Sequence, residues 1–209
     1  LECAVDKYLT SARLVEAGLP TPATVVCEHA EEALEAFERL GGDLVVKPIF
    51  GSEGRGILRV SDPDLALRTF RTLERLQTVL YLQQFIDHGG SDLRVMVLDG
   101  RVLGGMRRHS PDDFRTNISR NGRAEAAVPD EFECDMALRA SAAVGTRVAG
   151  IDILTDCSGQ RYVIEVNAVP GWRAFQRATG QDVAALIVES LERGAGACPE
   201  STTSCNLSG

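Results

Sequence analysis

The sequence predicts an α+β fold, because several of its expected strands are joined as hairpins that lie between helices. The dipeptide Asp99-Gly100 stands between two apolar runs, and Asp-Gly is a strong signal for a tight turn between antiparallel strands. The chain has 209 residues, of which 44% are hydrophobic and 25% are charged. This composition is typical of a globular protein with a sizeable core.

Five helices are expected from apolar periodicity and from start and stop signals. Gly18 and Pro20 end the first helix, and Pro63 occupies the first turn of the third, where proline is tolerated. The helices are expected at residues 6–17, 30–40, 62–76, 130–144 and 182–193. The small and polar residues 194–209 are expected to form a disordered tail.

Strands are expected where β-branched and apolar residues fill the remaining segments. One hairpin turns at Asp99-Gly100 and a second turns around Ser158-Gly159. The expected strands span residues 24–27, 44–49, 57–60, 78–86, 93–98, 101–108, 147–154 and 161–167. Hairpins between helices favour an α+β fold over a doubly wound parallel sheet.

Charge and cysteine usage limit the function classes. A net charge of −8 argues against broad binding to nucleic acid or to a membrane surface, which needs a basic face. No apolar run is long enough to span a membrane, and no signal-peptide pattern is present. The six cysteines form no Cys-x-x-Cys pair, so reduced thiols and a cytoplasmic location are expected. Because the first residue is Leu1, an upstream region is expected to be missing.

The stretch "VVKPIFGSEGRGILRV" (45–60) contains Lys47, one of only two lysines among 22 basic residues. Gly51, Gly54 and Gly56 follow it between two strands, which excludes a P-loop or Rossmann turn, where the glycines lead into a helix. Protein kinases place the lysine after the glycine loop, and here it comes before. One interpretation is a glycine flap that closes over phosphates beside a lysine. The alternative is a glycine-rich turn with a lysine that extends to solvent.

The second hairpin brings three oxygen-bearing side chains together. If its turn centres on Ser158-Gly159, Asp152 lies opposite Glu165, and Asn167 shares the strand face of Glu165. Facing carboxylates repel each other, and a hard cation such as Mg²⁺ would remove the conflict. The alternative is a solvated sheet face on which the repulsion is screened.

An arginine-rich stretch, "MRRHSPDDFRTNISRNGR" (106–123), interrupts this acidic chain. Guanidinium groups bind carboxylates and phosphates bidentately, so the stretch could hold an anionic substrate. The alternative is a solvated loop in an arginine-biased sequence. Asp92 and Arg94 precede it at alternate positions of a strand, a pattern that by itself indicates a surface ion pair.

The combination and order of these features resemble the ATP-grasp superfamily, and within it the RimK-type α-L-glutamate ligases. The most specific strings are "DFRTNISRNG", "AGIDIL" and "VIEVNAVPGW", and the resemblance runs from about Asp6 to Arg193. It implies an ATP-grasp domain at 1–193, in which two α+β subdomains grip ATP. These are a lid-bearing part at about 20–85 and a metal-binding part at about 86–193, with helix 6–17 leading in. The small N-terminal domain of the family is expected to be missing.

The resemblance also implies a nucleotide site. Lys47 would contact the ATP phosphates beneath the lid, and with Arg115 it would be catalytic. Asp92 would contact the ribose, and Lys7 would lie near the nucleotide. The remaining contacts are implied for the lid residues Gly51, Ser52, Gly54 and Gly56, for the adenine-cradling residues Gln83, Gln84 and Phe85, and for the phosphate-binding residues Arg115, Thr116 and Asn117.

The metal and substrate sites follow in the same way. Mg (or Mn), as two ions, would be bound by Asp152, Glu165 and Asn167, and substrate carboxylates by Arg107, Arg108 and Arg120. The chain departs from the family where Gln84-Phe85 replaces Glu-Tyr and where Val169 replaces a common serine.

The implied function is an ATP-dependent ligase that forms a C–N (amide) bond. It would add L-glutamate to an acceptor carboxylate, on a protein tail or a coenzyme, through an acylphosphate. Two alternatives stay open. One is a ligase that tails a pterin or deazaflavin coenzyme with glutamate, and the other is a non-catalytic nucleotide-binding module. A homo-oligomer is also left open.

Overall fold

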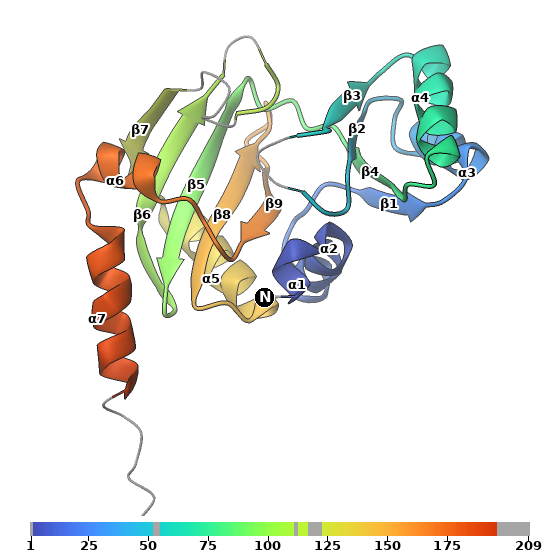
Figure 1. Cartoon of the computed structure of the whole chain (residues 1–209). Helices are drawn as coiled ribbons and strands as arrows, with labels where there is room; N and C mark the ends of the chain where they lie inside the picture. The colour runs from blue at the N-terminus through green and yellow to red at the C-terminus, as the bar shows by residue number, and fades with distance from the viewer. Residues whose placement is uncertain (1, 52–54, 111–112, 117–122, 196–209) are drawn as a thin grey trace, which may run out of the picture.

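The computed structural model describes residues 2–51, 55–110, 113–116 and 123–195. It contains two antiparallel sheets that lie side by side, each covered by helices (Figure 1). Every strand pairing within them is antiparallel, which confirms the predicted α+β class. No helix in the described ranges is long and apolar enough to cross a membrane.

The small sheet has four strands in the order β1 (Thr24–Cys27), β4 (Leu80–Gln84), β2 (Leu44–Lys47) and β3 (Leu58–Val60). Helices α3 (Ala30–Arg39) and α4 (Pro63–Arg75) cover one face. Phe37 and Phe70 are buried between these helices and the sheet. The other face is therefore left for the cleft, and β2 and β4 carry its side chains.

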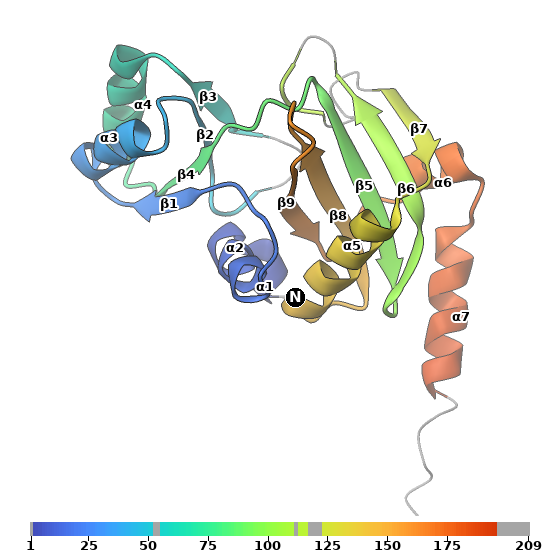
Figure 2. The ribbon, with the colours of Figure 1, turned by 180° about the vertical axis from the view of Figure 1, so that it is seen from behind.

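The large sheet has five strands in the order β7 (Arg123–Ala127), β6 (Arg101–His109), β5 (Ser91–Leu98), β8 (Val148–Thr155) and β9 (Arg161–Asn167). Helix α5 (Glu131–Val144) crosses its rear face, and α2 (Lys7–Glu16) packs against α5 and β9 (Figure 2). Leu14, Met136 and Ile151 lie in the core between them. The short helix α1 (Glu2–Val5) precedes α2.

A separate apolar cluster covers part of the front face of the large sheet. It contains Met96 and Met106 from the sheet, Phe175 from α6 (Arg173–Thr179) and Val183 from α7 (Val183–Ala195). The two helices thus close the end of this face beside β6 and β7, as Figure 1 shows. The part of the front face nearer the small sheet carries polar side chains instead.

The starts of the five predicted helices lie within one residue of the observed ones, and aspartates cap α2, α4 and α5. Asp6 accepts hydrogen bonds from the backbone N–H groups of Tyr8 and Leu9, at 2.8 and 3.0 Å. Asp62 caps α4, and Asp130 forms a reciprocal capping box with Glu133 at the start of α5. Each such cap stabilises a protein by about 1 kcal/mol.

Three elements were not predicted: α1, β7 and α6. Strand β7 lies in the stretch expected to be a polar loop, and it forms by pairing with β6 rather than from apolar alternation. Helix α7 reaches Ala195, so residues 194–195 are helical and not part of a disordered tail. The rest of the predicted tail lies outside the described residues. Cys3, Cys27, Cys134 and Cys157 are free thiols, as expected.

Gly105 provides a test of packing at the crossing of β6 and the loop before α5. A Cβ atom there would lie 2.8 Å from Pro129 Cγ and 3.1 Å from the Ala127 carbonyl oxygen. We expect Gly105→Ala to lower the free energy of unfolding by about 1–3 kcal/mol, measured by urea denaturation. Gly171→Ala is the matched control, because a Cβ at Gly171 meets nothing within 4 Å. Equal stability of the two variants would contradict this account of the packing.

Candidate active site

A cleft lies between the polar faces of the two sheets. The small sheet contributes Val45, Lys47 and Gln83, and the large sheet contributes Asp92, Arg108, Asp152 and Glu165. Phe85 and the segment around Arg115 also line the cleft. The structure therefore brings together side chains that are far apart in the sequence, such as Lys47 and Glu165.

Lys47 ends β2 and directs its ammonium group into the cleft. Its Nζ atom donates a hydrogen bond to the side-chain oxygen of Gln83 at 2.5 Å. Burial lowers the pKa of Lys47 to about 8, although Glu165 and Asp152 attract its positive charge and act in the opposite direction. Near neutral pH the cleft thus holds a lysine that is mostly charged and poorly solvated.

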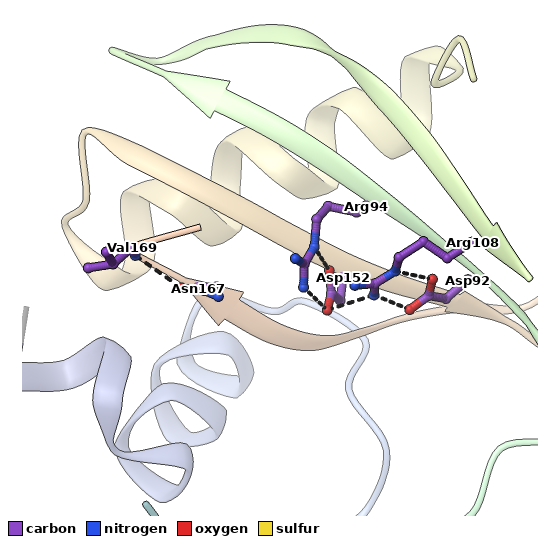
Figure 3. Close-up of polar contacts among 6 residues, drawn as sticks. All are labelled: Asp92, Arg94, Arg108, Asp152, Asn167 and Val169. Carbon is purple, nitrogen blue, oxygen red and sulfur yellow. Dashed lines mark hydrogen bonds and ion pairs between the residues drawn. The ribbon is translucent and has the colours of Figure 1, made fainter. Parts of the chain in front are cut away.

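The floor of the cleft is a buried chain of alternating charges (Figure 3). Arg94 binds Asp152 bidentately at 2.6 and 2.7 Å, and Arg108 reaches the same carboxylate at 2.8 Å. Arg108 also binds Asp92 bidentately, with one contact of 2.7 Å. Burial alone would raise the pKa of Asp152, but the two guanidinium groups lower it to about 2. Asp152 is therefore ionised and already neutralised by protein charges.

These buried ion pairs correct the expectation of a surface ion pair between Asp92 and Arg94. Both residues lie on the same face of β5, but Asp92 pairs with a residue of β6 and Arg94 with a residue of β8. The side chain of Asp92 is only 1% exposed. Arg94 is thus a site residue that the sequence did not reveal, although its alternate spacing from Asp92 placed it on the correct face.

Glu165 lies directly opposite Asp152 in the β8–β9 register, as predicted. The pKa of Glu165 is raised, first by burial and then by the facing Asp152, and Arg94, Lys47 and Lys7 only partly offset this. Within the described ranges no side chain donates a hydrogen bond to the Glu165 carboxylate. In contrast to Asp152, Glu165 has no guanidinium group of the described residues bound to it, and its negative form is disfavoured.

The chemistry of these donors fits a hard divalent cation. Carboxylate and amide oxygens are the ligands that Mg²⁺ prefers, and Glu165 offers a carboxylate without a hydrogen-bond donor of its own. Asn167 ends β9, where its side-chain oxygen accepts a hydrogen bond of 3.0 Å from the backbone N–H of Val169 (Figure 3). Asp152, Glu165 and Asn167 would together hold such an ion. As a ligand set they stay a prediction.

A second cavity lies on the other side of Glu165 and is lined by Lys7, Gly51, Asn167 and Val169. The Lys7 ammonium donates hydrogen bonds to the backbone oxygens of Gly51 at 2.8 Å and of Ile49 at 3.4 Å. It thereby ties helix α2 to the segment that follows β2. Ile164 and Glu165 line both cavities, so the two spaces lie next to each other at this part of β9.

The predicted adenine segment divides into three different environments. Gln83 is 2% exposed and its side chain is bound to Lys47, whereas Gln84 on the opposite strand face is exposed. Phe85 lies under the guanidinium of Arg59, 3.5 Å from its ring centroid, and meets the edge of Phe114. Phe85 thus lines the cleft with an aromatic ring, while the Gln83 side chain is bound to Lys47. Contact of this segment with adenine stays a prediction.

The predicted phosphate and substrate residues are only partly brought together. Thr116 is buried at the cleft, and Arg115 lies beside it with its guanidinium on Asp113 at 2.8 Å. Arg108 is buried in ion pairs, so it does not offer a free guanidinium to a substrate. Arg107 alternates with Arg108 on β6 and does not line the cleft.

The remaining predicted site residues concern the lid and the arginine-rich loop. Gly51 and Gly56 adopt positive φ angles of 142° and 73°, which a residue with a side chain rarely tolerates. The backbone conformation therefore favours glycine at both ends of the glycine stretch. Four predicted residues lie outside the described ranges: Ser52, Gly54, Asn117 and Arg120.

Two antiparallel sheets with a lysine and two carboxylates facing each other across the cleft define an ATP-grasp protein. The chain belongs to the RimK-like ATP-grasp family, since the sequence model of the RimK-like ATP-grasp domain matches residues 4–191. The resemblance inferred from the sequence is therefore confirmed.

Similar proteins agree with this assignment. A tetrahydromethanopterin:alpha-L-glutamate ligase of Methanosarcina acetivorans is 33% identical, over 92% of this chain and 68% of that protein. A probable alpha-L-glutamate ligase of Rhodopirellula baltica is 34% identical, over 89% of this chain and 46% of that protein. The chain thus spans only 46% to 68% of the length of these two relatives.

Solved structures confirm the ATP-grasp fold. The ATP-grasp ligase PsnB, complexed with a phosphomimetic variant of a minimal precursor, Mg and ADP, has a TM-score of 0.74 at 26% identity. The match covers 92% of this chain and 59% of that one. D-cycloserine synthetase DcsG has the same TM-score at 22% identity, over 92% of this chain and 71% of that one.

The raised pKa of Glu165 generates a stability prediction. An acid whose pKa is raised by folding lowers the stability of the protein above its ordinary pKa of 4.5, where the unfolded chain ionises more readily than the folded one. We therefore expect Glu165→Gln to melt at a higher temperature than wild type at pH 7. The difference should shrink as the pH falls toward 4.5, where the side chain becomes protonated in the unfolded chain as well. Thermal denaturation followed by circular dichroism at several pH values measures this effect.

Glu35→Gln, at an exposed position of α3, is the control and should leave the melting temperature nearly unchanged. A Glu165→Gln variant less stable than wild type at pH 7 would contradict the electrostatic account of this carboxylate.

Proposed function

We propose that this chain is the ATP-grasp part of an ATP- and Mg-dependent ligase that adds L-glutamate to an acceptor carboxylate. The observation that carries the proposal is the meeting of Lys47, from the small sheet, with Asp152 and Glu165, from the large sheet, in one cleft. A buried ammonium beside paired carboxylates is complementary to a nucleotide phosphate chain and its divalent cation. The names of the relatives support glutamate as the added amino acid.

The proposed reaction has two steps. An acceptor carboxylate oxygen attacks the γ-phosphorus of ATP, which gives an acylphosphate and ADP. The amine of glutamate then attacks the acyl carbon, and the tetrahedral intermediate expels inorganic phosphate and leaves an amide. A proton from the amine is released to solvent. Both steps depend on positioned reactants and on neutralised phosphate charge.

The residues of this chain would divide these tasks. Lys47 supplies a fixed positive charge to the phosphates, and Arg115 lines the same cleft. Glu165 and Asn167, next to Asp152, would hold Mg²⁺, which when bound neutralises charge that develops on the phosphoryl oxygens. Closing the glycine segment would exclude the water that hydrolyses an acylphosphate.

The second cavity suits the acceptor, because it shares Glu165 with the nucleotide cleft and has Lys7 to attract a carboxylate. Three exposed apolar side chains line it: Val5 at 59%, Phe50 at 67% and Val169 at 71% exposed. Such a lining favours an acceptor with an apolar or ring portion near its carboxylate. This observation, with the name of the Methanosarcina relative, makes a coenzyme acceptor the second candidate beside a protein tail.

Turnover with glutamate tests the proposal. The full chain is incubated with Mg²⁺, ATP, glutamate and candidate acceptors, and ADP release is measured together with the mass of glutamate-extended products. Lys47→Ala should lower the rate by about a hundredfold or more, because charge stabilisation of the transferring phosphoryl group is lost. Arg71→Ala, which removes an exposed charge from α4, should leave the rate unchanged.

Nucleotide binding without turnover on any acceptor would favour the non-catalytic module instead. Undiminished turnover in Lys47→Ala would contradict the role assigned to the lysine. A further assay adds an upstream domain from a relative. Turnover that appears only with this domain indicates that the chain alone lacks part of its acceptor site. Absence of turnover with it indicates that the chain does not catalyse the reaction.

The pKa of Lys47 predicts how nucleotide affinity depends on pH. Below its pKa of about 8 the lysine is charged and attracts phosphate, and above that value the charge is lost. The affinity for ADP should therefore fall as the pH rises through about 8, as measured by isothermal titration calorimetry. Lys47→Arg keeps its charge over this range, so its affinity should vary less with pH. A wild-type affinity that rises between pH 7 and 9 would contradict this prediction.

A further inference from the structure

A buried hydrogen-bond network lies behind Lys47 and reaches helix α2. The Lys47 ammonium donates to the Gln83 side-chain oxygen at 2.5 Å. The amide nitrogen of Gln83 lies 3.1 Å from the Thr24 hydroxyl and 3.4 Å from the Tyr81 hydroxyl. The Tyr81 hydroxyl in turn lies 2.7 Å from the hydroxyl of Ser11. The network thus joins β2, β4, β1 and α2.

The chemistry of the groups fixes the direction of each hydrogen bond that Gln83 makes. An ammonium group only donates, so the atom of Gln83 that faces Lys47 is its oxygen, and its NH₂ group faces the two hydroxyls. The Thr24 hydroxyl donates to the Pro22 carbonyl at 2.9 Å and is thereby free to accept from Gln83. Tyr81 accepts from Gln83 and shares a hydrogen bond with the Ser11 hydroxyl, in which either group can donate. A flipped amide would place N–H groups against the ammonium, so this network has one favourable orientation.

Burial makes the network rigid. Gln83 is 2% exposed, Tyr81 is 1% exposed, and Ser11 is 9% exposed. Breaking a hydrogen bond here would leave a buried polar group without a partner, which costs about 1–3 kcal/mol. The Gln83 amide cannot rotate independently of its neighbours and therefore holds the ammonium at one place.

The amide is also electrically neutral, in contrast to the partners of the two buried arginines. Arg94 and Arg108 are bound by carboxylates, which cancel their charge within the protein. Lys47 instead receives a neutral hydrogen-bond acceptor, which brings no countercharge. The positive charge of Lys47 thus remains directed into the cleft.

We propose that Gln83 is a positioning residue, locked by Tyr81 and Thr24, that fixes the Lys47 ammonium through a neutral acceptor and leaves its charge for an anionic ligand. The identification of that ligand as a nucleotide phosphate rests on the proposed function. The resemblance places Gln83 in the segment that cradles adenine, and this proposal instead gives its side chain a role toward the phosphates.

Gln83→Glu tests the proposal, because it keeps the shape of the side chain and adds a countercharge. The affinity of the full chain for ADP with Mg²⁺ should fall about 10- to 100-fold, since an ion pair then competes for the ammonium. Gln77→Glu adds the same charge at an exposed position after α4 and should bind ADP as wild type does. Circular dichroism verifies that both variants are folded.

Tyr81→Phe tests the lock and keeps Gln83 in place. Loss of one neutral hydrogen bond should weaken ADP binding by about 2- to 10-fold. Tyr8→Phe, at a tyrosine that is 51% exposed, is its control and should have no effect. This variant also keeps the proposal falsifiable if Gln83→Glu does not fold.

Acylation of lysine gives a readout that needs no nucleotide, because the chain has only two lysines. At pH 7, acetic anhydride should modify Lys47 of Gln83→Glu about tenfold more slowly than Lys47 of wild type, with Lys7 as internal reference. One unit of raised pKa gives this factor. Peptide mass spectrometry quantifies both sites.

The outcomes separate the proposal from the function on which it rests. A wild-type chain that does not bind ADP refutes the nucleotide site, and the acylation of Lys47 then decides the positioning role alone. Wild-type rates of Lys47 acylation in Gln83→Glu overturn the proposal. Unchanged ADP affinity in both Gln83→Glu and Tyr81→Phe overturns it as well.

Discussion

The arrangement of the site depends on one constraint: the carboxylate of Asp152 is buried and must be neutralised there. An ionised carboxylate that is buried is stabilised by hydrogen-bonded cations, and Arg94 and Arg108 supply them to Asp152 from the two strands β5 and β6. Asp92 then neutralises Arg108, so the alternating ion pairs lie within the large sheet. Because each planar guanidinium fixes the orientation of the next carboxylate, the floor of the cleft is rigid beside Lys47 and Glu165.

Local signals predicted most of the fold and one important contact of the site. The prediction that Asp152 faces Glu165 is correct, but only because two deviations from the predicted register cancel. Near the turn, Leu154 pairs with Tyr162, one residue out of the predicted register, and a bulge next to Asp152 then restores it. The sequence contained the turn signal but not the bulge. A prediction of register from turn position alone would have failed on the residues nearer the turn.

Long-range pairings could not be predicted, since local sequence does not specify which strands become neighbours. Asp152, the partner of Arg94, is 58 residues away and contacts it only because β5 and β8 are adjacent. Strand alternation separates the side chains of Gln83 and Gln84, because successive side chains point to opposite faces. The contact of Gln83 with Lys47 depends in addition on the pairing of β2 with β4, which local sequence does not specify.

The two facing carboxylates, Asp152 and Glu165, differ in how far the protein stabilises their charge. Asp152 receives two arginines and has a pKa of about 2, so its charge is stabilised before any ligand arrives. Glu165 lies opposite and is only partly exposed, and its pKa is raised because its surroundings and the facing Asp152 disfavour its charge while only more distant cations oppose this. If both carboxylates were paired like Asp152, the cleft would be more stable and would attract a cation less. Of the two carboxylates, Glu165 is therefore the one whose negative charge would gain more from an added cation.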